Sequence, residues 1–166
     1  MQCIVNGVNE PPNPPPRYAP QRALPPYSYV PGKFPHPLSD PAGHSYAHAA
    51  APQADEFAYA VDLFNHGYYW EAHEAWESLW HAAGRSGPRA DGLKGLIKLA
   101  AAGVKAREGN VRGVTRHARR AQELFASGTN ETGDTVRVLL AIALHIEQNA
   151  AAQAQDWFVR LNGAGD

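Results

Sequence analysis

The sequence is poor in cysteine and in long hydrophobic runs. Its one cysteine, Cys3, cannot form a disulfide within the chain and fits a reducing compartment. No apolar run reaches the length that spans a bilayer, and no stretch has the apolar centre of a signal peptide. We therefore expect a cytoplasmic protein with no membrane partner.

Proline is nearly absent from the larger, C-terminal part of the chain. Thirteen of the 14 prolines lie at or before Pro52, and only Pro88 follows. Residues after Pro52 are rich in alanine and leucine at helical spacing, and no strand pattern is convincing. The sequence predicts a disordered, proline-rich tail in residues 1–23 and an all-α domain in residues 53–166.

Residues 24–52 form a proline-rich segment with an unusual content of aromatic residues. Tyr27, Tyr29, Phe34 and Tyr46 recur within it, whereas disordered linkers contain few aromatic side chains. We expect an extended arm that packs these rings on the helical body, either on the aromatic surface around Trp70, Trp76 and Trp80 or elsewhere. A second subunit of a homodimer is the other surface that the arm could cover.

Glycines mark the ends of about five expected helices. The helices are expected at about 55–66, 68–83, 88–109, 110–128 and from 134 onward. The first two and the next two repeat one plan, helix–Gly–helix, as in tetratricopeptide-like hairpins. Two such units are too few for a solenoid, so the sequence predicts a compact array. Trp157, Phe158 and Leu161 indicate that the C-terminal tail packs back on this array.

Charge is segregated between the two expected hairpins. Residues 55–81 contain six acids and neither lysine nor arginine, whereas residues 85–123 contain ten bases and three acids. We interpret this pattern as attraction between the hairpins combined with solvated outer faces. Nucleic-acid binding is the more specific interpretation. The basic segment lacks interleaved aromatics and any motif of a known nucleic-acid-binding fold, so we do not expect that partner.

The stretch 64–80 is the most distinctive part of the chain. Placed on a helical wheel, four of its side chains share one stripe: Tyr69, His73, Trp76 and Trp80. His73 then falls in the middle of the apolar face, and Glu77, one turn later, lies at its edge. The wheel places three polar residues on the side facing water: Glu71, Glu74 and Ser78.

Two blocks of the sequence have a distinctive order of residues. The first reads Phe64-Asn65-x-Gly67-x-Tyr69-Trp70-Glu71-Ala72-His73-Glu74-x-Trp76-Glu77-x-Leu79-Trp80, and the second joins Gly95-Leu96-Ile97-Lys98-Leu99-Ala100 to Gly109-Asn110. Their fixed order resembles the signature of the domain-of-unknown-function 309 family over about residues 55–125. The resemblance implies a small all-helical array from the bacterial or archaeal cytoplasm and implies no established activity. It marks five residues as a site by position alone: His73, Glu74, Trp76, Glu77 and Trp80.

The chemistry of this stretch leaves several interpretations open. His73 and Glu77 can bind one divalent metal ion together, with His36 or His44 of the arm as further ligands if the arm covers the site. The zinc-protease pattern requires a second histidine at position 77, and a di-iron bundle requires Glu-x-x-His spacing, so both identifications are rejected.

Without a metal, the same residues can form a buried structural pair or a small-molecule pocket. The pocket hypothesis takes His73, Glu74 and Glu77 as candidate catalytic groups for hydrolysis of an unknown small molecule. Its candidate ligand-binding residues are Tyr69, Trp70, Trp76, Trp80 and Lys98. The alternative function is a non-catalytic protein-interaction module made of the helix hairpins.

Overall fold

The computed structural model describes residues 14–40, 53–127, 134–152 and residue 161, and its secondary structure in these ranges is helical without strands. Five α-helices follow one another: α1 Gln53–Asn65, α2 Tyr69–Ala82, α3 Pro88–Arg107, α4 Val111–Ser127 and α5 Asp134–Gln148. The predicted all-α array is thereby confirmed. The predicted helix ends agree with the observed ones to about two residues, the usual uncertainty of such boundaries.

The α1–α2 and α3–α4 hairpins close with the same turn. Gly67 and Gly109 both adopt left-handed backbone conformations, with φ of 82° and 75°. In each turn the next residue's amide donates to a carbonyl five residues earlier: Tyr68 to Leu63, and Asn110 to Lys105, both at 2.8 Å. A side chain at either glycine would strain this helix-ending motif, which explains the repeated helix–Gly–helix pattern.

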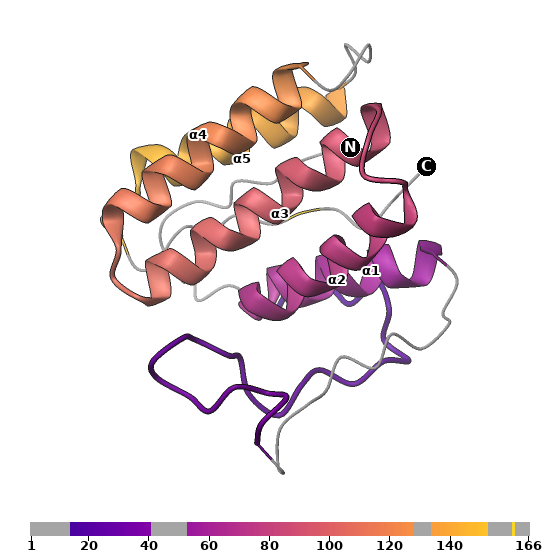
Figure 1. Cartoon of the computed structure of the whole chain (residues 1–166), viewed down its shortest axis with the longest axis vertical. Helices are drawn as coiled ribbons and strands as arrows, with labels where there is room; N and C mark the ends of the chain where they lie inside the picture. Colours follow the sequence, from indigo (N-terminus) through magenta and orange to yellow (C-terminus); the bar gives the residue numbers. More distant parts are fainter. Residues whose placement is uncertain (1–13, 41–52, 128–133, 153–160, 162–166) are drawn as a thin grey trace.

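Helix α3 lies between α2 and α4 in the array, and each helix packs on the next one along the chain (Figure 1). Two glycines allow the close approach. A Cβ atom at Gly95 would lie 2.3 Å from the Phe125 ring of α4, and one at Gly103 would lie 2.4 Å from the Tyr69 ring of α2. Each missing side chain therefore admits one aromatic ring from a neighbouring helix.

The core is continuous through the array. Its fully buried large side chains come from each helix: Leu63, Trp76, Leu99, Phe125 and Ile146. None of the described helices combines the length and the apolar character that crossing a bilayer requires.

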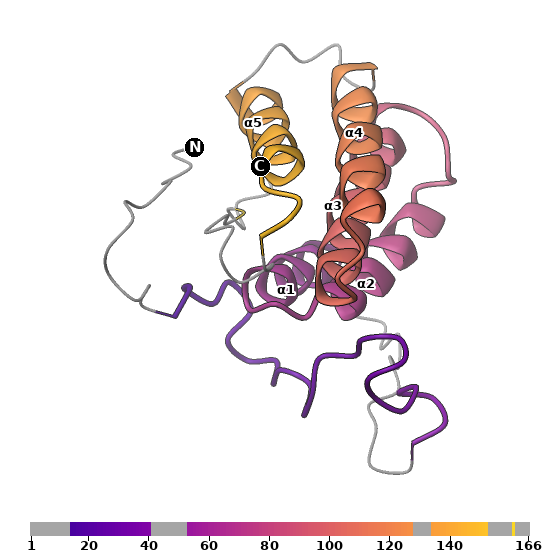
Figure 2. The same ribbon diagram turned by 90° about the vertical axis from the view of Figure 1, so that its left-hand side faces the viewer.

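The described part of the N-terminal segment packs on α1 and α2, beneath which it runs in Figures 1 and 2. Arg17 forms an ion pair with Asp62 at 2.8 Å, and Arg22 forms one with Glu56 at 2.6 Å. Ala19 is completely buried. Docking therefore begins within the segment expected to be a tail, before the predicted start of the arm at residue 24. Tyr46 lies outside the described residues.

The C-terminal tail also fastens to α1. Leu161 is buried and exchanges two hydrogen bonds of 2.8 Å with the side chain of Asn65. This contact confirms the prediction for Leu161, whereas Trp157 and Phe158 lie outside the described residues.

Candidate functional site

Helix α2 presents its core face through Ala72, Ala75, Trp76 and Leu79. His73 is therefore not in the middle of the apolar face, as the wheel predicted, but at its border, with 28% of its side chain exposed. The predicted apolar face is rotated relative to the observed one, because the helical wheel assumed that only one side of the helix is covered. In the structure α2 is covered on a second side, by the N-terminal arm.

Glu71 lies on that second covered side. Its side chain is fully buried, and its Oε1 accepts a hydrogen bond of 2.7 Å from the backbone amide of Tyr29. The prediction that Glu71 faces water is wrong. A carboxylate is buried at acceptable cost when donors replace its water, and here the arm supplies a donor.

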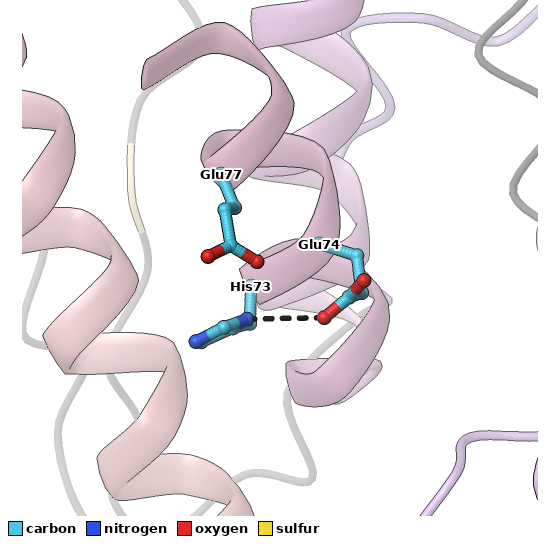
Figure 3. A group of neighbouring side chains, drawn as sticks. All are labelled: His73, Glu74 and Glu77. Carbon is cyan, nitrogen blue, oxygen red and sulfur yellow. Dashed lines mark hydrogen bonds and ion pairs between the residues drawn. The ribbon is translucent and has the colours of Figure 1, made fainter. Parts of the chain in front are cut away.

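A cluster of one histidine and two carboxylates lies on the partly open side of α2. The candidate ligand atoms of His73, Glu74 and Glu77 all lie within 4.8 Å of one another. Figure 3 shows the three side chains projecting together, with His73 Nδ1 and Glu74 Oε1 hydrogen-bonded at 3.3 Å. We call these three residues the His–Glu–Glu cluster.

The hydrogen-bonded partner of His73 differs from the one predicted. Sequence spacing favoured Glu77 and placed Glu74 on the far side, facing water. In the structure Glu74 is 33% exposed, and its flexible side chain reaches back to the neighbouring imidazole. The wheel failed here because it describes Cβ directions, whereas the end of a glutamate side chain can move several ångströms from that direction.

The His–Glu–Glu cluster has the composition and separation of a metal-ligand set. Ligand atoms about 2.0–2.2 Å from one ion lie about 3–4.4 Å from each other, close to the separation in the cluster. Imidazole nitrogen together with carboxylate oxygen suits Zn²⁺, Mn²⁺ or Fe²⁺. Three protein ligands leave coordination positions for water or another molecule.

Trp80 and Lys98, both predicted ligand-binding residues, lie near a charged surface. Trp80 is half-buried on α2, and the Lys94 ammonium of α3 lies 5.9 Å from its ring centroid. Lys98 lines an open groove of about 890 Å³ between α3 and α4. We call this groove the basic groove, and six cations line it: Lys94, Lys98, Arg112, Arg116, Arg119 and Arg120.

His117 also lines the basic groove. It is half-buried, and its pKa is lowered from the usual 6.5 to about 4. Burial is the main cause, followed by the positive charges of Lys98 and Arg116, with smaller contributions from Lys105 and His73. Its imidazole is therefore neutral at pH 7. The signal in the sequence that could have predicted this groove is the accumulation of bases in residues 85–123.

Tyr69 and Trp76, two of the predicted ligand-binding residues, belong to the core. Tyr69 packs into the space at Gly103, and burial raises its pKa to about 12 against the opposite influence of Arg107. Trp76 has no exposed surface and packs against Phe64 with ring centroids 5.8 Å apart. The structure thus brings neither ring to an open pocket.

The arm contacts α2 at Trp70, the remaining predicted ligand-binding residue. The rings of Tyr29 and His36 lie edge-on to Trp70, with centroids 5.1 and 5.3 Å away. His36 does not join the His–Glu–Glu cluster, and it is exposed. His44, the other predicted ligand from the arm, lies outside the described residues.

Comparison with known proteins supports the resemblance found in the sequence. Residues 57–117 match the family described as Domain of unknown function (DUF309). A search of curated proteins found no match, and a search of solved structures found none either. The matched segment contains the His–Glu–Glu cluster and, from the basic groove, Lys94, Lys98, Arg112 and Arg116. Over residues 57–117, therefore, the chain is similar to the DUF309 family.

Proposed function

We propose that this protein binds a divalent transition-metal ion through His73, Glu74 and Glu77, and that the ion serves to bind or hydrolyse a small molecule in the cytoplasm. The observation that carries the proposal is the convergence of three candidate ligand atoms within 4.8 Å on a partly open side of α2.

Electrostatics favours this interpretation over a structural histidine–carboxylate pair. One carboxylate satisfies one imidazole, yet a second carboxylate lies within the same 4.8 Å. Two carboxylates so close repel one another when both are ionised. A dication between them removes that repulsion, and the partial exposure of the cluster gives an ion and its water molecules access.

A bound ion would supply Lewis-acid chemistry at the coordination positions that the protein leaves open. The residues of the chain hold the ion in place. The imidazole of His73 favours a transition metal over Ca²⁺ or Mg²⁺, and the carboxylates of Glu74 and Glu77 balance its charge.

Metal titration of the whole chain tests the proposal. The protein is purified without chelator and then stripped of any bound metal. We expect it to bind one Mn²⁺ or Zn²⁺ per chain, measured by calorimetry. His73→Asn and Glu77→Gln should each weaken binding by about tenfold or more, since each removes a ligand. Asp55→Asn, which alters an exposed carboxylate on α1, is the matched control.

Equal affinities of the wild type and the His73→Asn and Glu77→Gln variants would contradict the assignment of the ligands. Failure of the wild type to bind either ion at millimolar concentration would contradict the metal site altogether. The non-catalytic interaction module would then be the better hypothesis.

A further inference from the structure

The basic groove has far more positive than negative charge. Of the residues that line it, six are lysines or arginines and one, Glu123, is a carboxylate. Lys94 and Lys98 come from α3, and the four arginines come from α4. Basic residues of the segment 85–123 are thus gathered on one concave surface.

Most of these cations lack a neutralising partner within the described residues. Arg119 pairs with Glu147 of α5 at 2.5 Å, and Arg120 pairs with Glu123 at 2.6 Å. The other four form no ion pair with any described side chain: Lys94, Lys98, Arg112 and Arg116. Unneutralised like charges on adjoining helices repel, so a bound anion would stabilise this arrangement.

The unpaired cations form two short rows. Lys94 and Lys98 are one turn apart on α3, and Arg112 and Arg116 are one turn apart on α4. Neighbours within a row are therefore about 6 Å apart along the helix axis. An anion with one charged group can contact one row, whereas an anion with several charged groups can contact both rows.

From this geometry we propose that the basic groove is a second binding site, which takes a small molecule bearing two or more phosphate groups. Arginine side chains present paired N–H donors that match phosphate oxygens, and lysines add point charges. The groove volume of about 890 Å³ lies in the usual range for small-molecule sites. This site goes beyond the proposed metal function and does not depend on it.

His117 lies within the positive field of the groove. Lys98 and Lys105 on α3, Arg116 on α4 and His73 on α2 all lower the pKa of its imidazole, in addition to the larger effect of burial. A phosphate bound beside Lys98 and Arg116 would oppose that field and raise the His117 pKa. The histidine therefore provides a spectroscopic readout of anion binding.

Nucleic acid fits this groove less well. Single-stranded nucleic acid is held by aromatic side chains on which bases stack, and none of the residues lining the groove is phenylalanine, tyrosine or tryptophan. Among the described exposed large hydrophobic residues, Val111 is the one that lines it.

The test uses inorganic tripolyphosphate and the whole chain in buffer with a chelator, so that the His–Glu–Glu cluster plays no part. We expect saturable binding by calorimetry and an upward shift of the His117 pKa by NMR. Lys98→Gln and Arg116→Gln should each weaken binding about tenfold. Arg137→Gln, which removes the same charge from an exposed position on α5, should leave it unchanged.

Three outcomes would overturn the proposal. One is the absence of binding at millimolar tripolyphosphate, and another is equal weakening by Arg137→Gln and Arg116→Gln, which would indicate unspecific charge attraction. The third is a single-stranded oligonucleotide that binds more than about tenfold tighter and is affected by the same variants, which would assign the groove to nucleic acid. Far-UV circular dichroism of each variant confirms that it is folded.

Discussion

In the α1–α2 hairpin the carboxylates of Glu56, Asp62 and Glu71 lie inside the molecule. In the α3–α4 hairpin, by contrast, the cations of the basic groove line an open surface. Both hairpins close with the same glycine turn. One backbone plan thus supports two opposite uses of charge.

The difference lies in what covers each hairpin. We expected the acidic and basic hairpins to attract each other, but no ion pair joins them among the described residues. Arg17 and Arg22 of the N-terminal segment pair with the acids instead. Two buried acids of the first hairpin are thus neutralised from within the chain, whereas four groove cations of the second remain available to a ligand.

The largest expected effect is the loss of the buried carboxylate at the arm. Asp62 is fully buried and accepts hydrogen bonds from the Arg17 side chain and from the amides of Tyr18 and Ala19 at 2.7–2.9 Å. We expect Asp62→Ala to lower the free energy of unfolding by about 3–5 kcal/mol, because it leaves these donors without an acceptor. Urea unfolding measures the loss, and hydrogen exchange of residues 17–30 measures release of the arm.

Asp55→Ala is the control for that variant, since Asp55 is exposed on the same helix. It should change stability by less than about 0.5 kcal/mol. Similar losses in the two variants would show that the N-terminal segment does not neutralise Asp62 as described.

A smaller effect is expected at the contact between α3 and α4. Gly95→Ala would place a methyl group against the Phe125 ring, and overpacking of this kind costs about 1–3 kcal/mol. Gly92 lies on the same helix with open space around it, so Gly92→Ala should stabilise by up to about 1 kcal/mol through helix propensity. We expect the urea midpoint to fall in Gly95→Ala and to rise in Gly92→Ala. Shifts in the same direction would contradict the close packing at Gly95.

His117 should make the stability of the molecule depend on pH. Its folded pKa of about 4 lies below the unfolded value of 6.5, so the unfolded chain binds the proton more readily. The stabilising contribution is complete above pH 6.5 and is lost as the pH falls from 6.5 towards 4. Unfolding free energies at pH 7, 5.5 and 4.5 should therefore fall less steeply in His117→Gln. Parallel curves for wild type and variant would refute the assignment, and His81→Gln, at an exposed histidine, serves as control.

The smallest effect is expected at the exposed ion pair between Arg119 of α4 and Glu147 of α5. Hydrogen bonds from Arg119 and Gln122 lower the Glu147 pKa, yet Arg119 is 67% exposed. Arg119→Ala should cost no more than about 1 kcal/mol, less still at high salt, since water screens such pairs. A loss as large as that of Asp62→Ala would remove the contrast between buried and exposed ion pairs.

Local features of the fold were predictable because they depend on neighbours in sequence. Gly67 and Gly109 end helices, the residue after each glycine donates to a carbonyl five positions earlier, and such signals are visible in the chain itself. His73 and Glu77 were identified for the same reason. The approach of Glu74 to His73 was not, because helix geometry fixes the backbone and leaves the end of a long side chain free.

Long-range contacts account for the other errors. Glu71 is buried by an amide donor from Tyr29, 42 residues earlier in the chain. The ion pair between Arg17 and Asp62 spans 45 residues. Neither the helical period nor the composition of the proline-rich segment specifies which residues meet across such distances.

The end of α1 has a further consequence for the order of folding. Asp62 binds a segment 45 residues earlier, and Asn65 binds Leu161, 96 residues later. The hairpins need only local contacts, which form quickly, whereas these two attachments must first close long loops. We expect the helices to assemble first and the two chain segments to fasten to α1 afterwards, so that Asp62 leaves water only after the helices have packed.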